Sequence, residues 1–535
     1  MKKTLAISLI TAMMLSLFVG CSSSTETTTT QESAAVETEE ATVRTDLTFA
    51  FFRGMESVSP HTTAPEMWFQ EMVYETLVSV ENSGIEPCLA ESWEISEDGL
   101  VYTFQIREGV TFTNGTALDA YAVEANFDNI WADAQSLQWL ESLLLMERYG
   151  ATDEFTFEIV LTEPYYPTLT ELGLARPYGI GAPEIFIEGE PRNVTEAIGT
   201  GPYYLAEQKQ DEYVIMQMND TYWGEKPTIE TVTMKVIPDN QTRIMALENG
   251  EIDLIYGVNV LDAATLKIYE DSDTIHYATS EPNLTKHLVL NAQVAGLDDL
   301  AVRQAINHAI DKQAISDGVY YGMEQPADAL FAPNVPYCDI DLDPYEYDKD
   351  LAAQILDEAG WVMGSDGIRA KDGVKLSFSV IYDNNSVTCK PIVEFIQSEL
   401  KPLGINLTLS GYERASYFDY QKSGNFEIVV GVPWGQPYDP HTSLSAFRTP
   451  AYGDYTALSA LDNAEDIFQQ ITDFLVEVDE EKRQEQIANV LTGIHEAAVH
   501  VPLVYEANKA LYSDELQEVT FHPSPYTFPF WEFSY

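Results

Sequence analysis

The chain is poor in basic residues. It has 28 lysines and arginines against 86 aspartates and glutamates, which gives a net charge of −58 at pH 7. A surface of this sign repels nucleic acid phosphates and anionic lipid headgroups, so a nucleic acid partner is excluded. A small anionic ligand is not excluded, because a single basic residue in a pocket can still hold it.

Cysteine is also scarce. Apart from Cys21, the chain contains only Cys88, Cys338 and Cys389, and no two cysteines have Cys-x-x-Cys spacing. This excludes a cysteine-based metal knuckle. At most one disulfide can form among the last three, and three free, buried thiols are the alternative.

Enzyme signatures are missing as well. The sequence has no Gly-x-Ser-x-Gly elbow, no His-Glu-x-x-His motif, no P-loop and no dinucleotide fingerprint. These patterns are the ones that fix a nucleophile, a metal or a phosphate in place. We therefore predict no catalytic residue and no cofactor, with an enzyme on the same fold as a remote alternative. The chain also lacks the internal repeats of a repeat-built surface protein.

The N-terminus has the pattern of an export signal. Lys2 and Lys3 are followed by an apolar run over residues 5–19, and Gly20 precedes Cys21. The run is shorter than the roughly 20 residues that a membrane-spanning helix needs. Residues 1–20 are thus predicted to be a lipoprotein signal peptide, with lipid on Cys21 after cleavage. An ordinary secretory signal or a short anchor is the alternative.

A polar segment separates this signal from the folded part. Residues 22–43 are rich in Ser, Thr and Glu and almost free of large apolar residues, so residues 21–44 are predicted to be a flexible tether. The remaining chain is longer than one core normally supports, and 45% of all residues are hydrophobic. Two or three packed units are expected.

Periodicity predicts a mixed α/β architecture. The expected strands cover residues 47–51, 102–106, 155–161, 232–237 and 288–290. The expected helices cover residues 120–131, 299–311, 349–359, 390–403 and 480–498. Gly360 and Gly404 stand where two of these helices end and where a left-handed residue is favoured.

Several phrases then resemble one family in order and spacing. They are Leu89 to Trp93, Tyr102 to Phe104, Phe112 to Gly115, Gly199 to Tyr203 and Val302 to Asn307. Together they resemble the family 5 extracellular solute-binding proteins, the receptors of dipeptide, oligopeptide and nickel ABC importers. Further phrases are similar to the nickel-binding members, namely Val73 to Glu75, Leu174 to Pro177, Leu330 to Tyr337 and Trp434 to His441.

This resemblance implies a two-lobed periplasmic-binding-protein fold of type II, cluster C, with an extra subdomain in the first lobe. Lobe I would cover residues 45–285, with the inserted subdomain at about 88–198. Lobe II would cover 286–505, and residues 506–535 would return to lobe I. The two connecting strands would lie near residues 280–291 and 501–511, and the ligand would be enclosed between the lobes.

Arg176 is the main ligand-binding residue that we predict. It is the one charged residue in the stretch from Leu172 to Gly179. A guanidinium in such surroundings favours a carboxylate partner, which it can bind bidentately. The resemblance implies that this carboxylate belongs to an organic chelator. A structural ion pair with one of the many acidic residues is the alternative.

The resemblance implies further pocket residues, for each of which plain core packing is the alternative. Aromatic rings and a thioether are suited to lining such a pocket. These residues are Met67, Trp139, Trp434 and Tyr438, with Thr63 and Tyr526 placed by sequence register alone.

Two positions depart from the nickel-binding pattern. Tyr452 stands where those relatives have the histidine that ligates metal, and Ser136 stands where they have a second pocket arginine. Tyrosine is a poorer nickel ligand than imidazole. The metal ligand is therefore left unknown, with His441 as a weak candidate whose alternative is a structural role.

The predicted function is a lipid-anchored receptor that captures nickel as an organic chelate for an ABC importer. Its partners would be the permease and ATPase subunits, and the protein itself would be a monomer. It would lie on the outer face of the cell membrane, or on the periplasmic side in a cell with two membranes. A dipeptide or oligopeptide receptor is the alternative, in which Asp439 would hold the peptide amino terminus.

Overall fold

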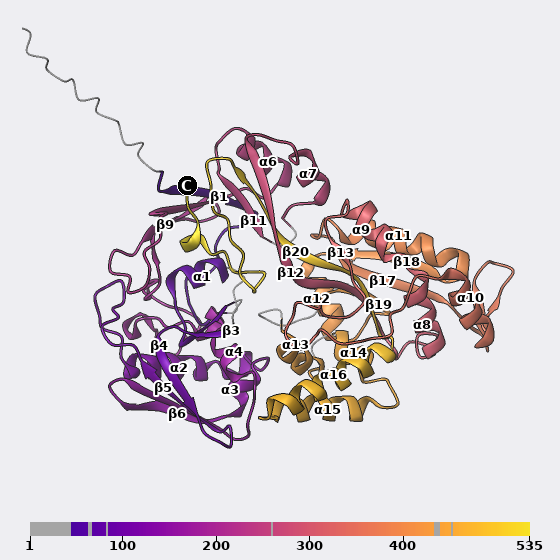
Figure 1. Cartoon of the computed structure of the whole chain (residues 1–535), viewed down its shortest axis with the longest axis horizontal. Coiled ribbons are helices and arrows are strands. Elements are labelled where there is room, and N and C mark those ends of the chain that lie inside the picture. The colour runs from indigo at the N-terminus through magenta and orange to yellow at the C-terminus, as the bar shows by residue number, and fades with distance from the viewer. Residues whose placement is uncertain (1–43, 63–66, 82–83, 258–259, 433–438, 451–452) are drawn as a thin grey trace, which may run out of the picture. The chain divides into compact units, whose positions relative to one another are not determined.

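Two long strands, β12 (Ile275–Leu290) and β20 (His500–Ser513), pair antiparallel over nearly their whole length in the computed structural model of the protein (Figure 1). The structure describes residues 44–62, 67–81, 84–257, 260–432, 439–450 and 453–535. From Leu284 to Leu290 every residue of β12 is buried, as is β20 from His500 to Leu511. The two connecting strands expected near 280–291 and 501–511 thus fall on β12 and β20.

Among the described residues, eleven strands form one sheet around this pair. Ten of them follow the order β18 (Asn406–Tyr412), β17 (Ser377–Asp383), β19 (Ile428–Gly431), β12, β20, β11 (Leu254–Gly257), β1 (Asp46–Phe51), β10 (Thr231–Val236), β9 (Tyr213–Met218) and β8 (Tyr203–Lys209), and β13 (Gln325–Pro326) pairs with β20. The sheet mixes parallel pairs, such as β1 with β10, and antiparallel pairs, such as β12 with β19.

Smaller sheets occupy the intervening segments. A four-stranded antiparallel sheet has the order β4 (Ala90–Ile95), β5 (Val101–Ile106), β7 (Thr156–Leu161) and β6 (Met146–Asp153). The others are β2 (Val78–Glu81) with β3 (Gly84–Pro87), and β14 (Val362–Met363) with β15 (Arg369–Lys371) and β16 (Val374–Lys375).

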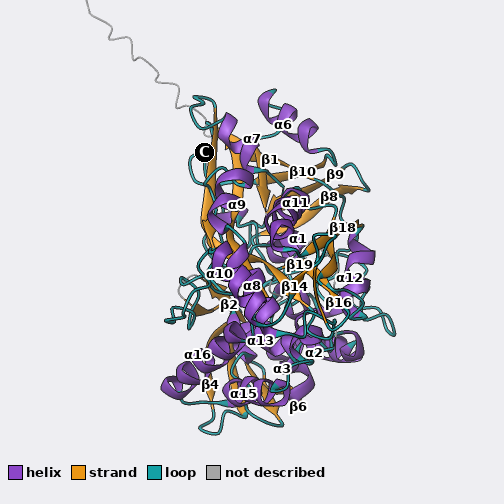
Figure 2. Ribbon diagram, turned by 90° about the vertical axis from the view of Figure 1, so that its right-hand side faces the viewer, coloured by secondary structure: helices purple, strands orange, loops and turns teal. Residues whose placement is uncertain are grey.

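Helices and strands are intermingled along the chain (Figure 2), which confirms the predicted mixed α/β class. The helices are α1 (Met67–Val73), α2 (Ala120–Ala132), α3 (Glu141–Leu145), α4 (Thr168–Leu172), α5 (Ala175–Tyr178), α6 (Asn240–Glu248), α7 (Ala263–Ile268), α8 (Leu300–Ala309), α9 (Lys312–Val319), α10 (Lys349–Glu358), α11 (Cys389–Leu400), α12 (Arg414–Lys422), α13 (Pro440–Phe447), α14 (Gly453–Leu458), α15 (Ala464–Val476) and α16 (Glu480–Glu496). Short 3-10 turns are η1 (Ala134–Ser136), η2 (Pro183–Ile185), η3 (Lys401–Leu403) and η4 (Phe530–Glu532).

Aspartate starts many of these helices. An aspartate side chain accepts a hydrogen bond from the first turn of α2, α6, α7, α8, α9, α10, α13 and α16. A carboxylate at this position satisfies backbone N–H groups and meets the positive end of the helix dipole. Part of the acidic surplus therefore defines helix boundaries. At the other end, Gly360 and Gly404 have φ of 85° and 79°, as their places after helices predict.

Buried apolar side chains of the described residues form two large cores and a smaller one, and both large cores include residues of β12 and β20. One combines the N-terminal strands with α1, α2 and parts of α13, α15 and α16. The other packs α8, α10 and α11 against β12, β17, β18 and β20. Cys88, Cys338 and Cys389 are free thiols. None of the described helices has the length and apolar character needed to cross a bilayer.

Replacing Leu288 with Ala should lower the free energy of unfolding by about 2–5 kcal/mol, because Leu288 is fully enclosed in the second core. Val362→Ala is the matched control, since Val362 is 68% exposed, and it should change the value by less than about 0.5 kcal/mol. Urea denaturation followed by tryptophan fluorescence measures both. Equal losses in the two variants would contradict this assignment of the core.

Candidate functional site

Arg176 lies on the short helix α5, between the buried residues Ala175 and Pro177. Its backbone is extended rather than helical, with φ −118° and ψ 108°. The side chain is half-buried. Helix α5 packs against α1, which therefore forms one side of the surroundings of Arg176.

Helix α1 presents a carboxyl group to Arg176. Burial raises the pKa of Glu71 to about 8, although the Thr527 hydroxyl and the positive charge of Arg176 act to lower it. The Thr527 hydroxyl donates to Glu71 Oε1 at 2.8 Å. Glu71 is therefore largely protonated at neutral pH, and a neutral carboxyl does not compete with an anionic ligand for Arg176.

Two further predicted residues belong to the same neighbourhood. Met67 is the first residue of α1, is buried and precedes Glu71 by about one helical turn. Tyr526 is half-buried and directly precedes Thr527, the partner of Glu71. The structure thus places Met67 and Tyr526 on the two segments that meet at Glu71.

Trp139 lies on a segment that joins two distant parts of the chain. The ring is partly buried and packs against the first core. Two residues later, Glu141 of α3 pairs with Arg448 and accepts a hydrogen bond of 2.5 Å from Ser445 on α13. The segment carrying Trp139 is therefore fixed against α13.

His441 has a structural environment. The ring is buried at the start of α13, where its Nδ1 lies 3.3 Å from the Asp439 carboxylate. It packs against the rings of Tyr166, Tyr337 and Phe474 at 4.8, 5.0 and 5.8 Å. These contacts support the structural alternative for His441.

Asp439 also has a structural role, as the cap of helix α13. Its Oδ1 accepts from the backbone N–H groups of His441 and Thr442 at 2.8 and 3.1 Å, which caps α13. Burial alone would raise the pKa of Asp439, but the charge of His441 and these hydrogen bonds hold it below its usual range. An ionised carboxylate already used as a helix cap is poorly placed to bind a peptide amino terminus.

An aromatic and arginine cluster beside His441 could not be predicted from sequence spacing. The Arg483 guanidinium lies over the Tyr166 ring, 3.3 Å from its centroid, and the Tyr166 hydroxyl contacts that of Tyr337 at 3.1 Å. Tyr337 also donates to Glu480 at 2.6 Å. In the sequence, the three-residue spacing of Glu480 and Arg483 is compatible with a pair on one helix face, but it does not indicate that Tyr166 is their neighbour.

The other predicted positions lie elsewhere. Ser136 is exposed at the end of η1. A cavity of about 20 Å³ is lined by residues that include Cys338, His495 and His500, but by none of the predicted ligand residues. The remaining predicted positions fall outside the described residues, namely Cys21, Thr63, Trp434, Tyr438 and Tyr452.

Comparison with known proteins identifies the class. The family model for bacterial extracellular solute-binding proteins, family 5, matches residues 84–455. The protein belongs to this family, which confirms both the predicted resemblance and the fold.

Individual relatives are similar over almost the whole chain. The nickel-binding periplasmic protein of Escherichia coli K12 is 37% identical over 491 residues, which cover 91% of this chain and 94% of the relative. The crystal structure of NikA from Brucella suis in complex with Fe(III)-EDTA has a TM-score of 0.88 and 40% identity, covering 91% of this chain and 99% of that one. The dipeptide-binding protein of E. coli K12 is 29% identical and covers 69% of this chain and 71% of the relative.

The protonated state of Glu71 predicts a pH effect on stability. The pKa of Glu71 is about 8 in the folded protein, against an ordinary value of about 4.3 for glutamate. Between these values the folded state binds the proton more tightly than the unfolded state, so the free energy of unfolding falls as pH rises through this window. Glu71→Gln should reduce this fall, because the amide keeps an oxygen for Thr527 but does not ionise.

Melting temperatures measured from pH 5 to 9 without ligand test this prediction. Glu91→Gln is the control, since Glu91 is exposed on β4. Parallel curves for the wild type and Glu71→Gln would show that Glu71 is ionised throughout.

Proposed function

We propose that this protein is the receptor of an ABC importer and captures nickel in the form of an organic chelate. The observation that carries the proposal is Arg176, a half-buried cation beside a carboxyl group that burial keeps protonated. A guanidinium in such surroundings binds a carboxylate strongly and with defined geometry. The ligand class that follows is a carboxylate-bearing small molecule.

A chelate matches the residues better than free nickel does. In a chelate the organic molecule supplies most of the metal ligands, so the receptor needs only shape, apolar surface and positive charge. Met67 and Tyr526 supply surface near Glu71, and Trp139, Trp434 and Tyr438 would complete it. Tyr452 replaces an imidazole and would contact the chelate instead of binding the metal tightly.

A peptide receptor is the second function to weigh, since a dipeptide-binding relative is also similar. A peptide ligand requires an acidic group for its amino terminus. Asp439 was the residue predicted for that role, and it caps α13 instead. This observation favours the chelate.

The sequence pattern at the N-terminus favours a receptor that is held at the membrane beside its permease. Residues 1–20 would be removed as a signal peptide, and lipid on Cys21 would anchor the mature protein through the tether 21–44. The outer face of the cell membrane is the proposed location, with the permease and ATPase subunits as partners and a monomeric receptor. The proposed lobes, 45–285 with 506–535 and 286–505, would close on the ligand.

A ligand panel should give a selective thermal shift. Binding to the folded state alone stabilises it by about 2.7 kcal/mol at a ligand concentration a hundred times the dissociation constant. Nickel–histidine and other carboxylate chelates of nickel should therefore raise the melting temperature more than free nickel does. A shift with short peptides alone would refute the nickel proposal.

Arg176→Ala should abolish the response to carboxylate chelates, and Arg176→Lys should weaken it, because lysine keeps the charge but loses the planar fork. Arg148→Ala is the matched control, as the Arg148 side chain is 62% exposed on β6. Isothermal titration gives the affinities, and the far-ultraviolet spectrum verifies folding. Unchanged affinity in a folded Arg176→Ala variant would assign Arg176 to a structural ion pair.

A further inference from the structure

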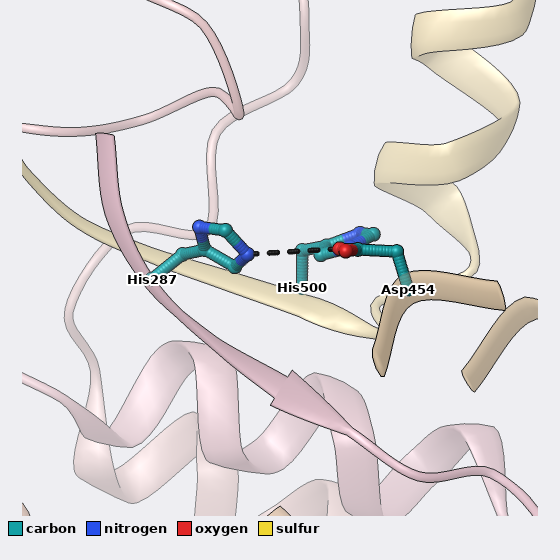
Figure 3. A group of neighbouring side chains, drawn as sticks. All are labelled: His287, Asp454 and His500. Atoms are coloured by element: carbon teal, nitrogen blue, oxygen red, sulfur yellow. Dashed lines mark hydrogen bonds and ion pairs between the residues drawn. The ribbon is translucent and has the colours of Figure 1, made fainter. Parts of the chain in front are cut away.

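Two histidines and an aspartate meet in the interior of the protein (Figure 3). His287 comes from β12, His500 is the first residue of β20, and Asp454 lies in the first turn of α14. All three are buried, with exposed fractions of 0%, 5% and 5%. Their potential ligand atoms lie within 4.8 Å of one another.

The strand register fixes the two histidines in place. His287 pairs with Pro502, and Val289 pairs with His500, so the two histidines are diagonal neighbours on one face of the sheet. Their ring centroids are 5.3 Å apart, and the Phe447 ring stacks on His500 at 5.5 Å. Both imidazoles are thus held rigidly while α14 brings Asp454 to them.

The contacts of His287 leave an electron pair facing a carboxylate. His287 Nδ1 lies 3.3 Å from the Thr285 carbonyl oxygen, which can only accept, so Nδ1 carries a hydrogen and, in the neutral ring, Nε2 has the lone pair. Nε2 is 3.8 Å from Asp454 Oδ1, beyond hydrogen-bond distance, and has no hydrogen-bond partner among the described residues. A neutral imidazole nitrogen and a carboxylate oxygen that face each other in a buried space would both be satisfied by a cation between them.

His500 faces the same carboxylate oxygen. His500 Nε2 lies 2.8 Å from Asp454 Oδ1, the oxygen that is 3.8 Å from His287 Nε2. Imidazole nitrogens and a carboxylate oxygen are ligand atoms that divalent transition metals accept.

The neighbouring strand leaves His287 without a side chain opposite. Gly431 ends β19 and pairs with His287, and a Cβ at this position would lie 3.6 Å from His287 Nε2, an ordinary contact distance.

We propose that His287, His500 and Asp454 form a binding site for a divalent first-row transition cation, separate from the solute site at Arg176. Two imidazoles and one carboxylate suit Zn²⁺, Co²⁺ or Ni²⁺, whereas Mg²⁺ and Ca²⁺ prefer all-oxygen sites. Bond lengths of about 2.0–2.2 Å require His287 and Asp454 to approach a shared ion. The ion would join β12 and β20 to α14, which begins directly after Tyr452.

The test uses the full mature protein, freed of metal with a chelator, incubated overnight with Zn²⁺ or Co²⁺ and desalted before metal analysis. The wild type should retain one equivalent and show the visible absorption of protein-bound Co²⁺. His287→Gln and Asp454→Asn should lose both signals. His276→Gln is the control, because His276 lies exposed on the same strand β12, and it should retain one equivalent.

A measurement on the unaltered protein covers the case in which the variants do not fold. X-ray absorption at the zinc edge of the wild type should show two imidazole ligands. A wild type without bound metal, or a zinc environment without imidazole, would overturn the proposal and leave a hydrogen-bonded structural cluster. Arg176→Ala should keep the bound Zn²⁺, so failure of the chelate proposal and failure of this one are distinguishable.

Discussion

The pairing of β12 with β20 is the constraint on which the other parts of the structure depend. The two strands carry a buried ion pair, in which Lys286 Nζ lies 3.1 Å from Glu506 Oε2 and Tyr320 donates to the other Glu506 oxygen at 2.6 Å. Removing one partner from such a pair leaves an uncompensated buried charge, which costs several kcal/mol. The register of the strands is therefore strongly specified. That register in turn positions β11 and β19 at their edges and sets His287 diagonal to His500.

Several of the few basic residues are used inside the fold. Among the described residues, seven lysines and arginines are almost fully buried, namely Arg243, Lys286, Arg303, Lys312, Arg369, Arg483 and Lys509. Arg303 donates to backbone carbonyls at 2.7 and 2.9 Å, and Lys509 pairs with Glu324. The surface is left strongly acidic and repels an anionic ligand at long range. The ligand is attracted at short range by a partly desolvated arginine, where screening is weak. This is why one residue, Arg176, has so much weight in the proposed function.

Local rules predicted much of the fold. The helices and strands expected from periodicity are present, because amphipathic spacing and aspartate caps act within a few residues. The surroundings of Arg176 could not be predicted from such local rules. Arg176 could be recognised by its uncharged surroundings, but its neighbour Glu71 sits 105 residues earlier, and the raised pKa of that carboxyl results from burial. His287 and His500 are likewise brought together by the pairing of β12 with β20, and α14 carries Asp454 to them. No spacing in the sequence indicates this cluster.

The two proposed sites have opposite electrostatic requirements, and they are built from different residues on different elements. A carboxylate chelate needs a positive group, which Arg176 would provide beside a Glu71 that burial keeps protonated. A bare divalent cation needs nitrogen and carboxylate ligands, which His287, His500 and Asp454 would provide. One pocket cannot satisfy both demands, because a carboxylate that attracts the cation repels the chelate. The acid-rich composition is compatible with an anion site at Arg176 because burial keeps the neighbouring Glu71 protonated.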